Sequence, residues 1–322
     1  MSDNILKIRD LSVNYQTDRG KLKALRNVDL DISRGSIVGV VGESGCGKST
    51  LITSIIRQLD SNADIPNGSI EFEKQDLLKL SLDKMRNISG TKLSIVFQDP
   101  MSTLNPVLSI GRQMIDIQYR DKISKKIKKQ RSIDMLTKVG IPDPQSQLNQ
   151  YPHELSGGMQ QRVSIAMALQ AGPSLLIADE PTTALDATLE VQILKLLKEL
   201  QEEMGCSILF VSHHLGVIAE LCDHVIVMYA GEIVEQGSTY EIFNNPAHPY
   251  TVKLLECDPA SISKKQRLLP SIPGEIPDLT NLSGGCIFKN RCDQSIDRCD
   301  KHTPKWNEFS NNHYVSCHLI ES

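Results

Sequence analysis

The residues best suited to chemistry lie in a glycine-rich loop, GESGCGKS, which fits the pattern G-x-x-x-x-G-K-[ST]. Its glycines let backbone N–H groups converge on an anion, and a helix that starts in the loop adds the positive end of its dipole. Lys48 can reach the β- and γ-phosphates of a nucleotide, and the Ser49 hydroxyl can ligate Mg²⁺. We therefore predict a nucleoside triphosphate site. Its residues are Gly42, Ser44, Gly45, Cys46, Gly47, Lys48, Ser49 and Thr50.

Two adjacent acids follow a strongly apolar run, SLLIADE, at Asp179 and Glu180. An acid pair after a strand often only caps a loop or a helix. Beside a phosphate loop, however, a buried strand that leads into two acids indicates a cation or a catalytic role. We expect Asp179 to coordinate Mg²⁺ through water and Glu180 to polarise the attacking water.

Three further polar residues follow predicted strands: Gln98 after KLSIVF, His213 after CSILFVS, and Tyr15 at the end of the first strand. An open α/β sheet assembles its site at the ends of its strands. A lone Gln or His in such a place is more often structural. These residues share one predicted sheet edge with the phosphate loop, so we assign them to the site.

Strand and helix patterns alternate along the chain, which predicts a mainly parallel sheet with right-handed crossovers. The stretch from about 105 to 170 is helical and forms a predicted inserted subdomain. The predicted strands are 5–15, 28–32, 36–42, 68–73, 92–97, 174–179, 206–212 and 224–230, with helices from the phosphate loop to Leu59 and over 188–204. Prolines, among them Pro259 and Pro270, mark a domain boundary near 255–260.

The composition excludes several classes of protein. The 322 residues carry a formal charge of −4, which argues against a protein that coats DNA. No apolar run approaches the roughly 18 residues of a membrane span, and the start, MSDNILKIRD, is charged where a signal peptide would be apolar. The sequence therefore predicts a cytosolic chain without a signal peptide or a transmembrane helix.

Cysteines gather near the C-terminus at Cys286, Cys292, Cys299 and Cys317. In a cytosolic protein such a cluster indicates metal rather than disulfides. Zinc modules favour C-x₂₋₄-C pairs, which this cluster lacks, although His302, His313 and His318 keep zinc open. The wide spacing favours a 4Fe-4S cluster over zinc, with unligated thiols as the third alternative. A metal would serve as a staple, because this proline-rich segment has few core residues.

The stretch LSGGMQQR, residues 155–162, completes a set of motifs in an order that resembles the nucleotide-binding subunit of an ABC transporter. The resemblance covers about residues 4–255. It implies an α/β ABC-type nucleotide-binding domain over 1–257, with a P-loop parallel-sheet core, an antiparallel β subdomain and the helical subdomain at about 105–170. Residues 258–322 would then form a small metal-stapled C-terminal appendage.

The resemblance also implies roles for individual residues. Tyr15 stacks on adenine, His213 senses the γ-phosphate, and Gln98 contacts Mg²⁺ and signals to the membrane subunits. The signature that closes on the partner's ATP consists of Ser156, Gly157, Gly158 and Gln160; the loop at the dimer interface consists of Ala184, Leu185 and Asp186. The implied catalytic residues are Glu180, His213 and Gln98, and the implied Mg²⁺ ligands are Ser49, Gln98 and Asp179. One departure is His214, where an Asp often follows the switch histidine.

Longer stretches are similar to the ATPases of oligopeptide and dipeptide importers: 98–111, 179–188, 248–255 and 272–279. Nickel and glutathione importers share much of this pattern. The tail also resembles the region that holds a 4Fe-4S cluster in some dipeptide-importer ATPases. The implied cofactors are ATP, Mg²⁺ and this cluster, with Zn²⁺ as its alternative.

The resemblance implies partners as well: a second, typically different ATPase subunit, two transmembrane permeases and an extracytoplasmic substrate-binding protein, with no nucleic acid. Such a subunit lies peripherally on the cytoplasmic face of the cell membrane. The competing interpretation is a non-transport ABC ATPase of DNA repair or translation. Those proteins carry coiled coils, inserted zinc modules or tandem ATPase domains, and we find none of these in the sequence.

Overall fold

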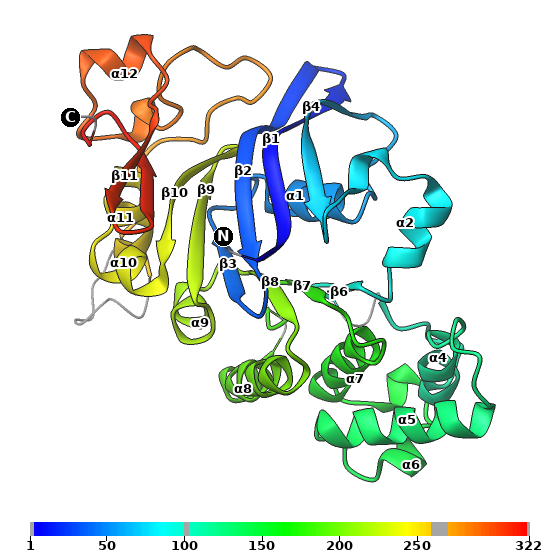
Figure 1. Ribbon diagram of the computed structural model, residues 1–322. Coiled ribbons are helices and arrows are strands. Elements are labelled where there is room, and N and C mark those ends of the chain that lie inside the picture. Colours follow the sequence, from blue (N-terminus) through cyan, green and yellow to red (C-terminus); the bar gives the residue numbers. More distant parts are fainter. Residues whose placement is uncertain (1–2, 100–102, 184, 259–269, 321–322) are drawn as a thin grey trace. The chain divides into compact units, whose positions relative to one another are not determined.

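The structure is a computed structural model that describes residues 3–99, 103–183, 185–258 and 270–320 (Figure 1). Of the residues discussed above, Ala184 and Pro259 and part of the 98–111 stretch lie outside this description. The chain divides into two compact units. The first contains the described residues up to Lys79 and from Phe210 onward, and the second spans Leu80–Leu209.

A four-stranded antiparallel sheet forms one layer of the first unit (Figure 1). The order of its strands is β2 (Gly20–Ser33), β1 (Asn4–Thr17), β4 (Ala63–Phe72) and β5 (Gln75–Asp76). In β1, Leu6 and Ile8 are buried and the residue between them is half-buried. This alternation follows from the period of two in strand side chains, which places one face against a core.

The second sheet of this unit is mixed. β3 (Ile37–Val41) runs parallel to β9 (His224–Tyr229), whereas β10 (Glu232–Ser238) is antiparallel to β9. The predicted parallel pairing is confirmed between β3 and β9, whereas the antiparallel β10 was not predicted. Ala230 and Gly231, with φ of 47° and 87°, form the two-residue turn that reverses the chain, and positive φ at both positions is typical of a tight hairpin.

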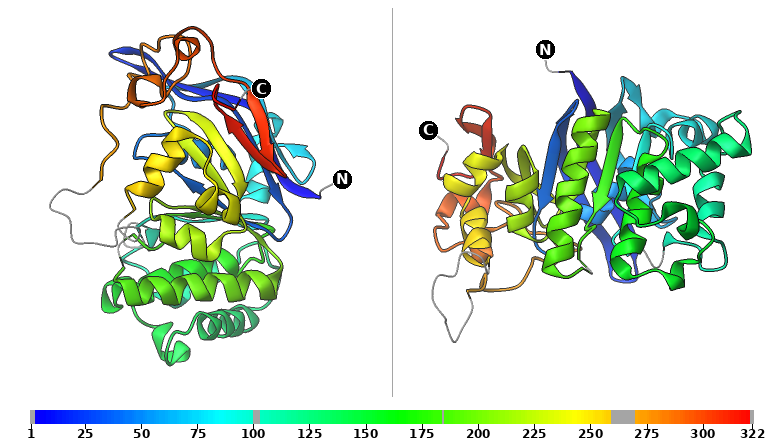
Figure 2. Two further views of the ribbon diagram at one scale, coloured as in Figure 1. Left: turned by 90° about the vertical axis from the view of Figure 1, so that its left-hand side faces the viewer. Right: turned by 90° about the horizontal axis from the view of Figure 1, so that it is seen from below.

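The C-terminal segment contributes to the same sheet. β12 (His313–Ser316) pairs antiparallel with β10, and β11 (Trp306–Ser310) pairs with β12 (Figures 1 and 2). The sequence analysis did not predict these strands. Their pairing fastens residues near the end of the chain to the sheet that carries β3, and so to the strand that leads into the phosphate loop.

The helices of the first unit are short. They are α1 (Lys48–Ile55), α9 (Leu215–Leu221), α10 (Thr239–Asn244), α11 (Pro249–Glu256) and α12 (Asp297–Lys301), with 3-10 turns η1 (Leu77–Lys79) and η4 (Lys289–Arg291). Helix α1 was predicted to reach Leu59 but ends at Ile55. Arg57 has a φ of 54°, a left-handed conformation that a right-handed helix cannot contain.

In the second unit, β6 (Leu93–Val96) is parallel to β7 (Leu175–Asp179). Its helices are α2 (Leu82–Ile88), α4 (Ile110–Asp116), α5 (Lys125–Lys138), α6 (Pro144–Gln147), η2 (Pro152–Glu154), α7 (Gly157–Leu169) and α8 (Ala187–Met204). Serine side chains cap α4, α5 and α7, which fixes where each helix starts. β8 (Ser207–Val211) crosses the boundary between the units. Within the described ranges, no helix is both long and apolar enough to cross a membrane.

Candidate functional site

The phosphate loop has a backbone that requires glycine at specific positions. Three of its glycines have positive φ: Gly42 at 154°, Gly45 at 79° and Gly47 at 110°. A Cβ atom on Gly42 would lie 2.2 Å from the carbonyl oxygen of Met228, and one on Gly47 would lie 2.9 Å from that of Ala24. The loop is therefore pressed against backbone on two sides, where a side chain has no room.

Lys48, the first residue of α1, is buried and folds back over the loop. Its Nζ atom donates to the carbonyl oxygens of Gly42, at 2.7 Å, and Glu43, at 3.2 Å. Ser49 is exposed in the same first turn of the helix. The ammonium group, the Ser49 hydroxyl and the free N–H groups at the helix start together form a site suited to an anion and its metal ion.

Buried side chains support the loop from behind. Burial raises the pKa of the Cys46 thiol, so this residue is a neutral packing group and not a nucleophile. The backbone N–H of Glu43 donates to the Tyr250 hydroxyl at 2.9 Å. Burial lowers the pKa of His248 to about 4, and its neutral Nδ1 accepts from the Tyr250 N–H at 3.0 Å. This chain of hydrogen bonds ties the loop to the start of α11.

Two of the other predicted residues lie in the same unit. Tyr15 is half-buried in β1, where it pairs with Leu22 of β2. His213 is exposed just after β8, and the ring of His214 lies edge-on to it at a centroid distance of 5.1 Å. The N–H of the preceding Ser212 donates to a carbonyl of β3, so His213 follows a residue bonded to the strand that enters the phosphate loop.

In the second unit, two predicted residues from neighbouring strands meet. The Gln98 amide nitrogen donates to the Glu180 carboxylate at 2.9 Å. The parallel pairing of β6 with β7 brings them together, because the two residues follow adjacent strand ends. Thr183, which the sequence analysis missed, donates its hydroxyl to the same oxygen at 3.1 Å. Its only sequence signal is its position three residues after Glu180.

Glu180 has a φ of 46°, which is rare for a residue with a Cβ atom and common at functional sites. Asp179 is the last residue of β7, directly before it. The three predicted Mg²⁺ ligands are divided between the units, because Ser49 belongs to the first, and Asp179 and Gln98 belong to the second. With its nitrogen engaged by Glu180, Gln98 keeps its amide oxygen available as a metal ligand.

The signature stretch forms the start of α7. Ser156 is the N-cap, and its Oγ accepts from the Met159 N–H at 3.4 Å. A Cβ atom on Gly157 would meet nothing within 4 Å, whereas one on Gly158 would lie 3.0 Å from Leu189. Gln160 is buried and donates to the carbonyls of Pro152 and Leu155, at 2.9 and 3.1 Å. Ser156 and Gly157 are thus open at the helix start, while Gln160 holds the loop in place.

The predicted interface loop leads into α8. Asp186 is exposed and caps this helix, its carboxylate accepting from the Leu189 N–H at 2.9 Å. Leu189 is also the side chain that limits the space beside Gly158. The predicted interface loop and the signature stretch therefore adjoin within the second unit.

The four clustered cysteines line one small pocket, of about 10 Å³, together with His248, Phe288 and His318. Burial, with a smaller effect of the neighbouring thiols, raises the pKa of Cys286 to about 12. Across the described residues, however, no three His, Cys, Asp or Glu side chains are grouped so that they could hold a metal ion. This finding does not support the metal site predicted from the cysteines.

The three histidines considered as zinc ligands have different surroundings. His313 is fully buried, and its Nε2 lies 2.7 Å from the carboxylate of Glu235, which is also fully buried. The Nε2 atom of His318 donates to the His302 carbonyl, 2.7 Å away, because a carbonyl oxygen can only accept. His313 therefore fastens β12 to β10, and of these three histidines only His318 lines the cysteine pocket.

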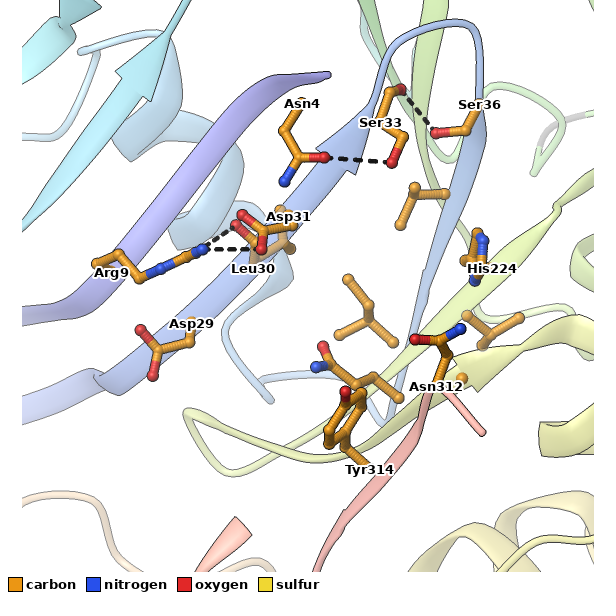
Figure 3. A pocket seen from close by; sticks show the side chains of 15 residues that line it. Asn4, Arg9, Asp29, Leu30, Asp31, Ser33, Ser36, His224, Asn312 and Tyr314 are labelled. Atoms are coloured by element: carbon orange, nitrogen blue, oxygen red, sulfur yellow. Dashed lines mark hydrogen bonds and ion pairs between the residues drawn. The ribbon is translucent and has the colours of Figure 1, made fainter. Parts of the chain in front are cut away.

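A separate cavity of about 740 Å³ opens in the first unit (Figure 3). Arg9 and Asp31 form an ion pair in its wall, with an N–O distance of 2.8 Å, and each side chain is a little under half exposed. Ser36 and Val38 line it at the N-terminal end of β3, whereas the phosphate loop follows the C-terminal end. This cavity is therefore distinct from the nucleotide site.

Comparison with known proteins places this geometry in a family. Residues 25–183 match the family described as ABC transporter, and residues 234–299 match the one described as oligopeptide/dipeptide transporter, C-terminal region. The oligopeptide transport ATP-binding protein OppD of Bacillus subtilis is 44% identical over 98% of this chain and 89% of its own length. The dipeptide transport ATP-binding protein DppD of Escherichia coli is 41% identical, over 98% and 96%. The chain belongs to the ABC transporter ATP-binding subunits.

Solved structures of this family agree with the assignment. The ATP-binding cassette MJ0796, in a dimeric post-hydrolysis state bound to ADP and Pi, is 30% identical with a TM-score of 0.65, and the match covers 73% of this chain and 98% of that one. The corresponding values for cbiO1 of Clostridium perfringens are 32%, 0.65, 76% and 92%. The chain has the α/β ABC ATPase cassette fold, and its reaction is ATP hydrolysis coupled to transport.

Proposed function

We propose that this ABC subunit is the motor of an importer for dipeptides or oligopeptides. The observation that carries the proposal is the similarity of this chain, over 98% of its length, to ATP-binding proteins of peptide transport. The similarity includes a match to the oligopeptide/dipeptide transporter C-terminal region. The phosphate loop and the Gln98–Glu180 pair supply the chemistry that a motor requires. Nickel and glutathione remain alternative cargoes for the same motor.

In this proposal, the phosphate loop binds the ATP phosphates through its N–H groups and through Lys48. The ammonium group donates to two carbonyls of the loop, so it lies at the loop that would receive the phosphates. Ser49, Gln98 and Asp179 hold Mg²⁺, and Tyr15 stacks on adenine. The side chains of Ser49, Gln98 and Asp179 offer oxygen atoms, which are the ligands that Mg²⁺ prefers.

Glu180 polarises the water that attacks the γ-phosphate. Hydrogen bonds from Gln98 and Thr183 to one carboxylate oxygen orient the carboxylate that would accept from that water. His213 contacts the γ-phosphate and reports its presence. Because Gln98 bonds to the catalytic carboxylate, a movement imposed on Gln98 by a membrane subunit would reach the hydrolytic site directly.

The proposed assembly contains two ATPase subunits, of which the second is a different chain, two transmembrane permeases and an extracytoplasmic substrate-binding protein. It would place this subunit on the cytoplasmic face of the cell membrane. The test is affinity purification from membranes followed by reconstitution in vesicles. We expect permeases to co-purify and MgATP to drive uptake of a labelled dipeptide or oligopeptide. Uptake of nickel or glutathione instead would contradict the peptide assignment, and recovery of nucleic acid or ribosomes would contradict transport.

Ser156 should act on the ATP that is bound to the partner subunit. With ATP trapped, short crosslinkers should join the signature stretch to the phosphate loop of the partner, and isotope labelling of one subunit distinguishes the chains. The crosslink should disappear without nucleotide, because ATP closes the dimer. Crosslinks confined to residues 42–49 of the same chain would refute this arrangement.

We also propose that Cys286, Cys292, Cys299 and Cys317 hold a 4Fe-4S cluster. The support is that the four thiols line a common pocket although the first and the last are 31 positions apart in the sequence. A cluster spreads its ligands more widely than one metal ion does, which is compatible with the finding that no group is arranged for a single ion. The pocket is small, so the side chains would have to turn apart. The cluster would act as a structural staple.

A further inference from the structure

An arginine of the C-terminal segment reaches the phosphate loop. Arg291 ends the 3-10 turn η4, directly before Cys292, and its side chain is 4% exposed. Its two terminal nitrogens donate to the two carboxylate oxygens of Glu43, at 2.7 and 3.1 Å. Glu43 is the second residue of the phosphate loop. The two side chains thus form a bidentate ion pair, the strongest geometry available to an arginine and a carboxylate.

The remaining donors of Arg291 are also used. Its Nε donates to the Pro273 carbonyl at 2.9 Å and one Nη to that of Ile272 at 3.1 Å, while the other Nη lies 3.3 Å from the Tyr229 hydroxyl. The guanidinium is therefore fixed in position before it meets Glu43. Preorganisation of this kind reduces the side-chain entropy that is lost when the ion pair forms.

Glu43 is held at a second point by Tyr250 of α11. Tyr250, whose hydroxyl accepts from the Glu43 N–H, packs on Phe288 with a centroid distance of 5.4 Å. Phe288 also meets the ring of Tyr229 edge-on at 5.1 Å. Both the backbone and the side chain of Glu43 thus depend on residues that lie between 229 and 291.

The charge of Glu43 makes this support necessary. A carboxylate in a loop that receives the ATP phosphates repels them unless a cation compensates for it. The Glu43 side chain is 25% exposed, so water screens it only in part. Arg291 provides the compensating charge from within the fold, and Lys48 remains available for the phosphates.

We propose that Arg291 is a positioning residue of the ATP site, which acts through Glu43 to hold the phosphate loop and to neutralise its carboxylate. The inference rests on the proposed role of Gly42–Ser49 as the ATP-binding loop. It makes the C-terminal segment a working part of the nucleotide site, and it gives residues 272–291 a role in the affinity for ATP.

The test measures the Kd for MgATP by calorimetry with the full-length subunit. Arg291→Gln should raise the Kd about tenfold, since the carboxylate loses its counter-charge and the loop loses its anchor. In a Glu43→Gln background the same change should raise the Kd by less than about twofold. With the intact complex, KM for ATP should rise and kcat at saturating ATP should change little, because the chemistry at Glu180 is untouched.

Lys253→Gln is the matched control. Lys253 pairs with Asp293 at 2.9 Å, so it joins the same segment to α11 without touching the phosphate loop. The Kd of the Lys253→Gln subunit for MgATP should equal that of the unmodified subunit. If Arg291→Gln does not fold, Arg291→Lys keeps the charge but cannot bridge both carboxylate oxygens, and its Kd should rise about threefold.

An unchanged Kd in Arg291→Gln, or in Arg291→Lys if only that variant folds, would overturn the inference. Equal increases with and without Glu43 would overturn it too, because Arg291 would then not act through Glu43. Failure of the unmodified subunit to bind MgATP would instead overturn the assignment of the loop itself, and the two failures are therefore distinguishable.

Discussion

The Glu180→Gln subunit should bind ATP as tightly as the unmodified subunit but hydrolyse it at least about 10²-fold more slowly. A glutamine has the size of the glutamate and can still contact Gln98 and Thr183, so the local structure should be kept. It cannot accept the proton of the attacking water, so turnover stops while the closed, ATP-bound dimer accumulates. Phosphate release by the assembled transporter measures the rate, and calorimetry measures the affinity.

Lys48→Ala is the contrasting variant. It removes the cation that faces the phosphates, so it should lower the affinity for nucleotide itself and not only the rate. Thr183→Val is a milder control, because it removes one hydrogen bond to the carboxylate and leaves Gln98 in place. Near-normal hydrolysis by Glu180→Gln would show that another group polarises the water, and the assignment of Glu180 would then be wrong.

The sequence was most informative where a local pattern has one structural solution. The phosphate loop needs glycines at fixed positions because neighbouring backbone leaves no room for a Cβ atom there. The spacing of these glycines can be read directly from the sequence. The strand before Asp179 is buried and parallel to the strand before Gln98, so the meeting of Gln98 and Glu180 follows from strand order. The apolar runs and the polar residues that follow them were therefore enough to predict that these two side chains lie at one edge of the sheet.

Contacts between distant segments could not be predicted in the same way. Arg291 and Glu43 are 248 positions apart, and neither has a local environment that signals the other. Likewise, β12 is fastened to β10 by Glu235 and His313, and the sequence analysis considered His313 only as a possible zinc ligand. The turn at Ala230 and Gly231 lacks the usual Asn-Gly signal, so the antiparallel β10 was not foreseen.

Anaerobically purified subunit should be brown and contain about four irons per chain, held by the four-cysteine pocket. Burial and neighbouring thiols raise the pKa of Cys286 to about 12, so the Cys286 thiol is protonated when no metal is bound, and iron must displace that proton to bind. Because metal binding then supplies folding free energy to a segment with little core of its own, loss of the cluster should also expose residues 270–320 to protease.

Cys286→Ser should abolish the colour and the iron, whereas Cys257→Ser should leave both unchanged, since Cys257 does not line the pocket. Iron is counted by elemental analysis and protease sensitivity by mass spectrometry of the fragments. Colourless anaerobic protein with one zinc per chain would contradict the cluster, and protein with neither metal would mean that the pocket holds free thiols. In both cases Glu180 lies outside the affected residues, so ATP hydrolysis at saturating ATP would separate a failure of the cluster from a failure of the motor.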